Sequence, residues 1–416
     1  MTKLVVIFML FVPLGSARAD APLDLAAAQA EARSQAPDVD ALDALVRGAD
    51  ATARDAGRRF RTDPELSLDY STAAISGEAA EQAIGAGLSW TVDLTSAPRH
   101  RRDAAVAGRD RAGFDRADGL RALDEAVAIA MADLVFAQRQ LARAETLAGL
   151  FDASSALTQR RGASGAATLP EIDAAALDAI GARADVARAR GDVEHARIGL
   201  ARLLGRATHA GLVAADPAEP VDARAPASMP AADDPRIAAV AVGVRGADSE
   251  VRLAHRSVFS STTLGIDLGW ASHGIPAGAF MDPSVTARWK DWEIGVKVAV
   301  PIPLVDRRRE ERTQATARRD QAEAAAATTR ADVATAIATA RADLATASDV
   351  WKQMAPSAEI LDRAAKLLAR AFETGAIDAV ESAQALRRLV ESGRRLDQAV
   401  RDLRIARARW ERQTAR

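Results

Sequence analysis

The sequence predicts a mainly α-helical protein with a small β part, in which long helical hairpins and paired strands occur twice. Four segments alternate between apolar and polar residues with the period of a strand, and two long segments carry apolar residues in heptads. The second half of the chain repeats the plan of the first. Aromatic residues make up only 4 % of the chain and apolar residues 49 %, which favours long helices over a compact enzyme.

The first segment, residues 1–19, is predicted to be a secretory signal peptide. Lys3 precedes a short apolar run, and Ala17-Arg18-Ala19 is a small-x-small cleavage site. No later apolar run reaches about 18 residues, so we expect the mature protein to leave the cytoplasm without a helical membrane anchor. The sequence contains no cysteine, so we expect no disulfide, no thiolate metal site and no lipid-anchored N-terminal cysteine.

Strands are predicted at about 65–73, 84–94, 262–270 and 290–303. From Ile84 to Leu94 every even position is apolar and every odd position is glycine or polar, which gives the strand one apolar and one polar face. Such strands are typical of a transmembrane barrel, although a soluble antiparallel sheet alternates identically. The signal peptide and the few aromatic residues favour the membrane. Since a barrel needs about eight strands, several chains are expected to contribute.

A proline-free stretch from about Arg99 to Arg161 predicts one very long helix. Its heptad seam consists of Leu120, Val127, Leu134, Leu141 and Ala148, with Leu123, Ala130, Ala137, Ala144 and Phe151. A helix of about 63 residues is about 95 Å long, too long for one compact domain, and therefore indicates a coiled-coil arm. A shift of 210 residues maps this seam onto a second one from Val333 to Leu361 and predicts two hairpins of equal length.

The predicted organisation follows from these segments. A first repeat at 20–205 contains a hairpin at about 97–204, and a second repeat at 236–416 contains a hairpin at about 306–412. A Pro- and Ala-rich linker at 206–235 is expected to pack on the outside. Early in the repeat the shift is 198 residues, so the extra residues of the second half lie in a loop at 271–283, which is expected to face solvent.

The order, duplication and spacing of these segments resemble the TolC family of outer membrane factors. The resemblance is carried by the helix start Ala36-Pro37-Asp38, by the hairpin turns Gly162–Glu171 and Phe372–Glu381, and by the strand-to-helix passage Val298–Arg307. That passage is similar to the one in the CzcC and CusC branch, which serves heavy-metal efflux pumps.

The resemblance implies a homotrimer in outer membrane lipid. Four strands per chain would form a twelve-stranded transmembrane β-barrel, and the hairpins would form a periplasmic tunnel. It implies a passive channel that opens on docking to a periplasmic adaptor and an inner-membrane pump, with no catalysis and no cofactor.

The resemblance also implies pore residues near the hairpin tips. The candidates are Glu171, Glu381, Asp173, Asp378 and Gln384. Three copies of a carboxylate around a narrow pore would favour cations, although an acid at the start of a returning helix is also favoured by the helix dipole alone. Gln384 stands where the family has a second acid, and Ile377 stands where it has a basic residue, so the tip is expected to be held differently here.

Gly165 and Gly375 are predicted to allow the tight helix-to-helix turns, where positive φ favours glycine. Arg160, Arg161 and Arg370 flank the turns. The resemblance makes all five residues candidates for adaptor docking, while solvated charge near a helix end explains the arginines equally well.

Three other functions compete with the channel on the sequence. A duct for type I protein secretion would use the same tube with another inner-membrane partner. A periplasmic adaptor also has long hairpins, but usually one rather than two. An enzyme lacks support, because the chain has no nucleophile elbow, phosphate loop or metal-ligand cluster, and its five histidines are scattered. With 55 basic and 57 acidic residues, nucleic acid is not an expected partner.

Overall fold

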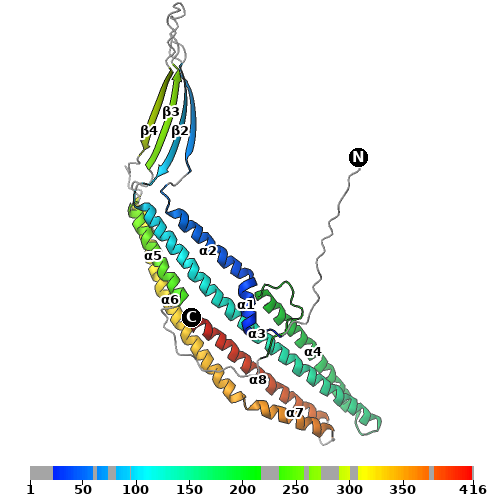
Figure 1. Cartoon of the computed structure of the whole chain (residues 1–416). Coiled ribbons are helices and arrows are strands. Elements are labelled where there is room, and N and C mark those ends of the chain that lie inside the picture. Colours follow the sequence, from blue (N-terminus) through cyan, green and yellow to red (C-terminus); the bar gives the residue numbers. More distant parts are fainter. Residues whose placement is uncertain are drawn as a thin grey trace, which may run out of the picture. The chain divides into compact units, whose positions relative to one another are not determined.

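The computed structural model describes residues 22–59, 63–73, 81–93, 95–216, 234–256, 262–272, 290–299, 308–373 and 379–414. The predicted signal peptide, most of the predicted linker and most of the loop at 271–283 lie outside these residues. Within them, the predicted fold class is confirmed: the chain is mainly helical, and four strands form one small sheet (Figure 1).

The elements of the first half are α1 (Leu25–Gln35), α2 (Pro37–Ala56), β1 (Glu65–Ala73), β2 (Glu81–Val92), α3 (Ala97–Ala163) and α4 (Leu169–Leu203). Those of the second half are α5 (Pro235–Arg256), β3 (Thr262–Ser272), β4 (Lys290–Ala299), α6 (Arg308–Met354), α7 (Ser357–Glu373) and α8 (Ala379–Thr414). A shift of 198 residues places the start of α2 on Pro235, the start of α5. A shift of 210 residues places the end of α3 on Glu373 and the start of α4 on Ala379. The duplicated hairpins therefore have arms of nearly equal length.

Two compact units each combine segments of both halves. The hairpin unit comprises Met1–Ala41, Ala117–Ala231 and Val333–Arg416, and the strand unit comprises Leu42–Arg116 and Ala232–Asp332. Neither predicted repeat is a compact body by itself, because the long helices α3 and α6 run from one unit into the other.

The predicted seam of α3 forms the core of the hairpin unit. Val127 and Leu134 are fully buried, and they pack in one cluster with alanines of α1 and with Leu200 of α4. Small side chains at Ala28 and Ala32, both fully buried, let α1 approach the long helix closely. The heptad seam thus determines which face of α3 is buried.

The start of the predicted linker is part of this core rather than peripheral. Leu212 and Ala214 are buried, and Leu23 forms a parallel bridge with Ala214. The N–H of Leu23 donates to the carbonyl of Val213 at 2.8 Å, and the N–H of Ala215 donates to the carbonyl of Leu23 at 2.8 Å. Two short segments far apart in the sequence are tied together here.

The second long arm is interrupted, whereas α3 runs for 67 residues without a break. A turn at Ala355 and Pro356 separates α6 from α7, because proline has no N–H to donate within a helix. The helical path resumes at once, since the N–H of Ala358 donates to the carbonyl of Ala355 at 3.1 Å. The seam predicted to continue through Ala358 is therefore wrong at that residue, which is exposed, while Leu344 is 3 % exposed as expected.

The strands form one antiparallel sheet in the order β1-β2-β3-β4. The strand predicted at 84–94 begins earlier, at Glu81, and ends at Val92. Its end is fixed by Asp93, whose N–H donates to the carbonyl of Arg59 at 2.9 Å and whose buried carboxylate accepts from Arg101 at 2.9 Å. The strand predicted at 290–303 ends at Ala299 within the described residues.

Candidate functional site

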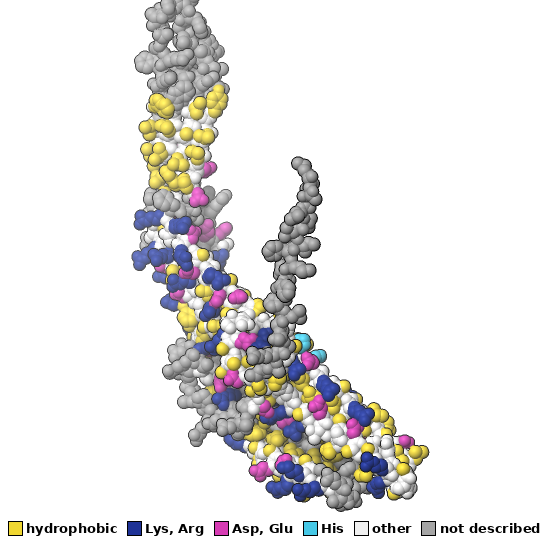
Figure 2. Space-filling view, turned by 45° about the vertical axis from the view of Figure 1, so that its right-hand side comes forward, with side chains coloured by type: hydrophobic (Ala, Val, Ile, Leu, Met, Phe, Trp, Pro, Cys, Tyr) yellow, Lys and Arg dark blue, Asp and Glu magenta, His cyan; other side chains and the backbone are white. Residues whose placement is uncertain are grey.

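One face of the sheet carries large apolar side chains that are exposed. The register aligns them in rows across the strands, one of which is Leu66, Leu88, Ile266 and Val296. The exposed members of this face are Leu66, Leu68, Tyr70, Ile84, Ile266, Leu268, Trp292, Ile294, Val296 and Val298. Figure 2 shows these hydrophobic side chains gathered over the sheet. A patch of this kind is unusual on a soluble monomer and marks a surface that another phase or protein covers.

The opposite face is polar and rich in glycine. Ser67 is aligned with Gly87, and Gly87 is aligned with Asp267. A Cβ on Gly87 would lie 2.5 Å from Oδ1 of Asp267 and 2.6 Å from Oγ of Ser67. The absence of a side chain at Gly87 therefore leaves space for Ser67 and Asp267. The two faces of the sheet differ both in polarity and in the size of their side chains.

The first hairpin tip is a tight turn after α3. Gly165 has φ +74°, as predicted for this position. Its N–H donates to the carbonyl of Gly162 at 2.9 Å, and the N–H of Ala166 donates to the carbonyl of Arg161 at 2.7 Å. These bonds are those of a Schellman motif, which ends a helix through a residue in the left-handed region. A Cβ on Gly162 would lie 2.4 Å from Cδ1 of Ile172, a close approach that the spacing of the turn did not reveal.

Glu171 caps the returning helix. Its carboxylate accepts a hydrogen bond from the N–H of Thr168 at 2.7 Å, in a capping box at the start of α4. Glu171 and Asp173 are both exposed. Arg160 and Arg161 are exposed as well, so the tip presents charges of both signs.

The second tip lies partly outside the described residues, which exclude Gly375 and Asp378. Glu381, in the first turn of α8, is exposed, as are Gln384 and Arg370. The matching ends of α3 and α7 and starts of α4 and α8 place Glu171 and Glu381 at equivalent positions of the two hairpins.

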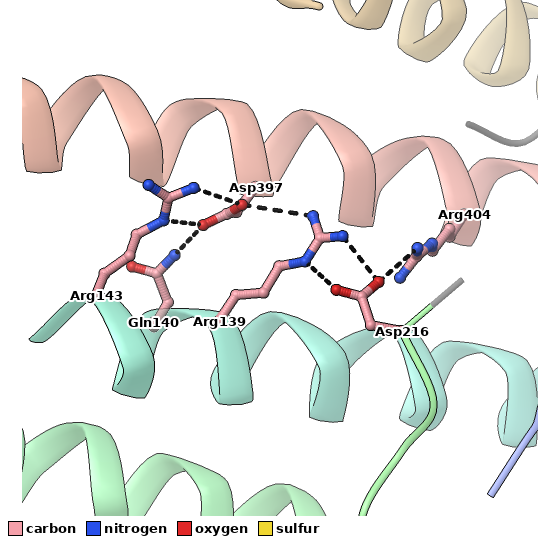
Figure 3. Close-up of polar contacts among 6 residues, drawn as sticks. All are labelled: Arg139, Gln140, Arg143, Asp216, Asp397 and Arg404. Carbon is pink, nitrogen blue, oxygen red and sulfur yellow. Dashed lines mark hydrogen bonds and ion pairs between the residues drawn. The ribbon is translucent and has the colours of Figure 1, made fainter. Parts of the chain in front are cut away.

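An ion-pair network around the buried Asp397 joins the two halves within the hairpin unit (Figure 3). Asp397 of α8 accepts hydrogen bonds from Arg143 at 2.6 Å and from Gln140 at 3.0 Å, both from α3. Arg139 donates to Asp216 at 2.6 Å, and Arg404 lies 3.2 Å from the same carboxylate.

The charges of this network also shift its pKa values. Burial acts to raise the pKa of Asp216, but the hydrogen bonds and charges of Arg139 and Arg404 outweigh burial and hold that pKa below its ordinary value. Burial acts to lower the pKa of Arg139, and the two aspartates outweigh it in turn. No sequence signal marks this network, because its members come from α3, from α8 and from the segment after α4, and only the folded structure brings them together.

Neither a metal cluster nor a membrane-spanning helix is found in the described ranges. No group of three or more histidine or acidic side chains there could hold a metal ion. No helix of the described part of the chain is long and apolar enough to cross a membrane.

Residues 228–413 match the sequence model of a family described as outer membrane efflux protein. This part of the chain is therefore similar to outer membrane efflux proteins. No protein of curated function matches the sequence.

The fold of this matched part and of the half before it is found in several solved structures. A membrane protein from Pseudomonas aeruginosa is 20 % identical, with 94 % of this chain and 93 % of that chain covered and a TM-score of 0.74. CusC is 18 % identical, with 96 % and 95 % covered and a TM-score of 0.73. The CmeC outer membrane channel of Campylobacter jejuni is 14 % identical, with 94 % and 85 % covered and a TM-score of 0.75. The chain therefore has the TolC-like fold, and CusC is no more similar to it than the others.

Proposed function

We propose that the protein is the outer membrane channel of a tripartite efflux system, a homotrimer that conducts substrate from a periplasmic adaptor and an inner-membrane pump to the exterior. The observation that carries the proposal is the exposed apolar face of a sheet whose outer strands, β1 and β4, each pair on one side only within the described residues. Outer membrane lipid would cover the apolar face, and β1 of one copy would pair with β4 of the next.

The number of copies follows from the strands and the family. Four strands do not close a barrel, for which about eight are the minimum, and three copies supply twelve. The CmeC structure is that of an outer membrane channel. Exposed apolar side chains on the hairpin unit, Leu177 and Ile180 on α4 and Ile360 and Leu367 on α7, supply surface for packing between neighbouring copies.

The hairpin tips are proposed as the adaptor-docking and pore-lining region. Arg160, Arg161 and Leu169 are exposed beside the first turn, and charged and apolar groups together suit a protein contact. Glu171, repeated three times around a narrow pore, would attract cations. The hydrogen bond from the N–H of Thr168 uses one carboxylate oxygen of Glu171, and the side chain keeps its negative charge.

Heavy-metal cations are proposed as the first cargo to test. Support comes from the passage Val298–Arg307, which resembles that of the heavy-metal efflux branch.

The decisive experiment expresses the full-length chain with its predicted signal peptide and fractionates the cells. A detergent-requiring trimer in the outer membrane fraction, forming conducting pores in planar bilayers, is the expected result. A soluble periplasmic monomer would overturn the channel and favour the adaptor function. Loss of metal tolerance on deletion of the gene supports metal cargo, whereas loss of a secreted protein would support the type I secretion duct.

A further inference from the structure

The strand unit contains the same helix pair twice. The segment Val-Arg-Gly-Ala-Asp, ending at Asp50 of α2 and again at Asp248 of α5, is followed four residues later by Arg54 and Arg252. The shift of 210 residues also maps Arg102 and Arg109 of α3 onto arginines of α6, at 312 and 319. With the arginine of the shared segment, each half therefore brings one equivalent aspartate and four equivalent arginines to a corresponding pair of helices.

In the second pair, carboxylates bind two neighbouring arginines of α6, Arg318 and Arg319. Arg319 lies 3.0 Å from Asp248 and donates to Glu323 at 2.7 Å. Arg318 lies 3.9 Å from Glu250. Glu250 and Glu323 have no acidic counterpart in the first half, so the second helix pair carries two more carboxylates than the first.

The first pair lacks those two carboxylates. Thr52 stands at the position equivalent to Glu250, and Gly113 at the position equivalent to Glu323. A surface hollow of about 420 Å³ lies here, lined by Asp50, Ala53, Arg54, Gly57, Arg58, Arg102, Val106 and Arg109. Four arginines thus face the hollow with a single carboxylate among the lining residues.

Arg102 is the arginine without a counter-charge. Its side chain makes no ion pair or hydrogen bond with any residue of the described ranges. It crosses Gly57, where a Cβ would lie 3.2 Å from Cδ of Arg102. The other three pair on the rim: Arg54 with Asp50, Arg58 with Asp55 at 3.2 Å and Arg109 with Asp110 at 2.7 Å. Pairs as exposed as these are weak, so a ligand can compete for the arginines.

The hollow lies close to the base of the sheet in the same unit. Arg102 comes five residues after Ala97, the first residue of α3, which is about 7.5 Å along a helix. Arg101 binds Asp93 at the end of β2 and donates to the carbonyl of Arg58 at 3.5 Å. Headgroups occupy roughly 5–8 Å on each side of a bilayer core. In Figure 2 basic side chains gather on the helices next to the sheet.

We propose that this hollow binds a phosphate group, that of a phospholipid headgroup at the periplasmic surface of the outer membrane or of free phosphate. The lipid source rests on the proposed function, because it needs the sheet in the membrane. Guanidinium groups match phosphate through paired N–H donors, and an uncompensated Arg102 beside three weakly paired arginines supplies those donors. The second helix pair is a poorer phosphate site, because Glu323 and Asp248 bind Arg319 and Glu250 lies beside Arg318.

Calorimetry on the full-length mature chain in nonionic detergent tests the site. The probes are phosphatidylglycerol, diacylglycerol, which lacks the phosphate, and inorganic phosphate. We expect phosphatidylglycerol to bind and Arg102→Ala to weaken binding about tenfold, the effect of losing a charged hydrogen bond. Arg330→Ala is the matched control, since Arg330 is an exposed arginine of α6 in the same unit, and it should bind like the parent protein.

A second variant keeps every arginine. Gly113→Glu adds the carboxylate that α6 carries at Glu323, into space that is open around Gly113, and should weaken phosphatidylglycerol binding several-fold. Equal affinity for inorganic phosphate, with the same dependence on Arg102, supports the site with free phosphate as its source. The proposal is overturned if diacylglycerol binds as tightly as phosphatidylglycerol, or if neither variant changes binding. Fractionation decides membrane location separately, so failure of the site is distinguishable from failure of the channel.

Discussion

Asp397 is buried, with 2 % of its side chain exposed, and its carboxylate lies 2.6 Å from Nε of Arg143. The pair joins α8, from the second half of the chain, to α3, from the first. Arg139 and Gln140 donate to the same carboxylate, so the acceptor capacity of Asp397 is well used. An acid held in this way ties the two helices together at one fixed point along their lengths.

Removing this carboxylate should destabilise the hairpin unit. Asp397→Ala removes the carboxylate that binds Arg143, while Arg139 keeps its pair with Asp216. Since Arg143 is 34 % exposed, the cost should be about 2 kcal/mol, below that of a fully buried pair. The apparent melting temperature of the purified protein measures the loss. Asp349→Ala is the control: it removes an exposed pair with Lys352, so it should change stability by less than about 0.5 kcal/mol. Equal effects of the two variants would show that Asp397 is not a structural tie.

The neighbouring Asp216 should make stability depend on pH in the acid range. Its pKa is lowered in the folded protein, so its contribution is fully present above the unfolded value of about 3.9 and is lost as pH falls through the folded value. Melting temperatures of the parent protein and Asp216→Asn should therefore differ at pH 7 and converge as the pH falls through and below the folded pKa of Asp216. A difference that stays constant across this range would contradict the assignment.

Gly205 should be more sensitive to substitution than Gly211. Both have positive φ, +71° and +80°, which costs a side chain roughly 1–2 kcal/mol. A Cβ on Gly205 would in addition lie 2.2 Å from the carbonyl oxygen of Gln35, whereas space around Gly211 is open. Gly205→Ala should lower the melting temperature much more than Gly211→Ala does, because the backbone at Gln35 must move to make room for the new Cβ. Similar losses would mean that backbone strain alone determines the cost.

The two faces of the sheet should respond differently to added charge. Val296→Arg places a cation on the apolar face, and at mid-membrane this costs about 2–4 kcal/mol. Ser67→Arg places the same cation on the polar face, beside Asp267. We expect the first variant to reduce the heat-stable, folded protein in the outer membrane fraction and the second to leave it nearly unchanged. Equal tolerance would indicate a soluble sheet.

Periodic features of this chain could be predicted from its sequence, and contacts between distant segments could not. Alternation located the strands and their apolar face, and heptads identified the buried residues Val127 and Leu134. The left-handed turn at Gly165 followed from glycine chemistry. The break at Pro356 was overlooked because the seam was carried across by symmetry with α3, although proline itself signals such a break.

The pairing of Asp397 with Arg143 had no signal, because the chain has many arginines and only packing selects among them. The arginine hollow has no sequence motif, because its side chains come from α2 and from α3, which are far apart in the sequence. Thr52 and Gly113 gain meaning only from their counterparts in the second half, Glu250 and Glu323, which pair with arginines.

Glu171 allows its helix cap and its charge to be tested separately. Glu171→Gln keeps an acceptor for the N–H of Thr168, and Gln also suits this position of a capping box, so stability should change by less than about 0.5 kcal/mol. Glu171→Ala removes the cap and should cost about 1 kcal/mol. If three copies of Glu171 line a narrow pore, both variants should lower the preference for cations in planar bilayers, measured as a reversal potential under a salt gradient. A reduced preference in Glu171→Gln at unchanged stability supports the pore role, since only the charge has been lost. Unchanged selectivity in both variants, with stability lost only in Glu171→Ala, would leave Glu171 a helix cap.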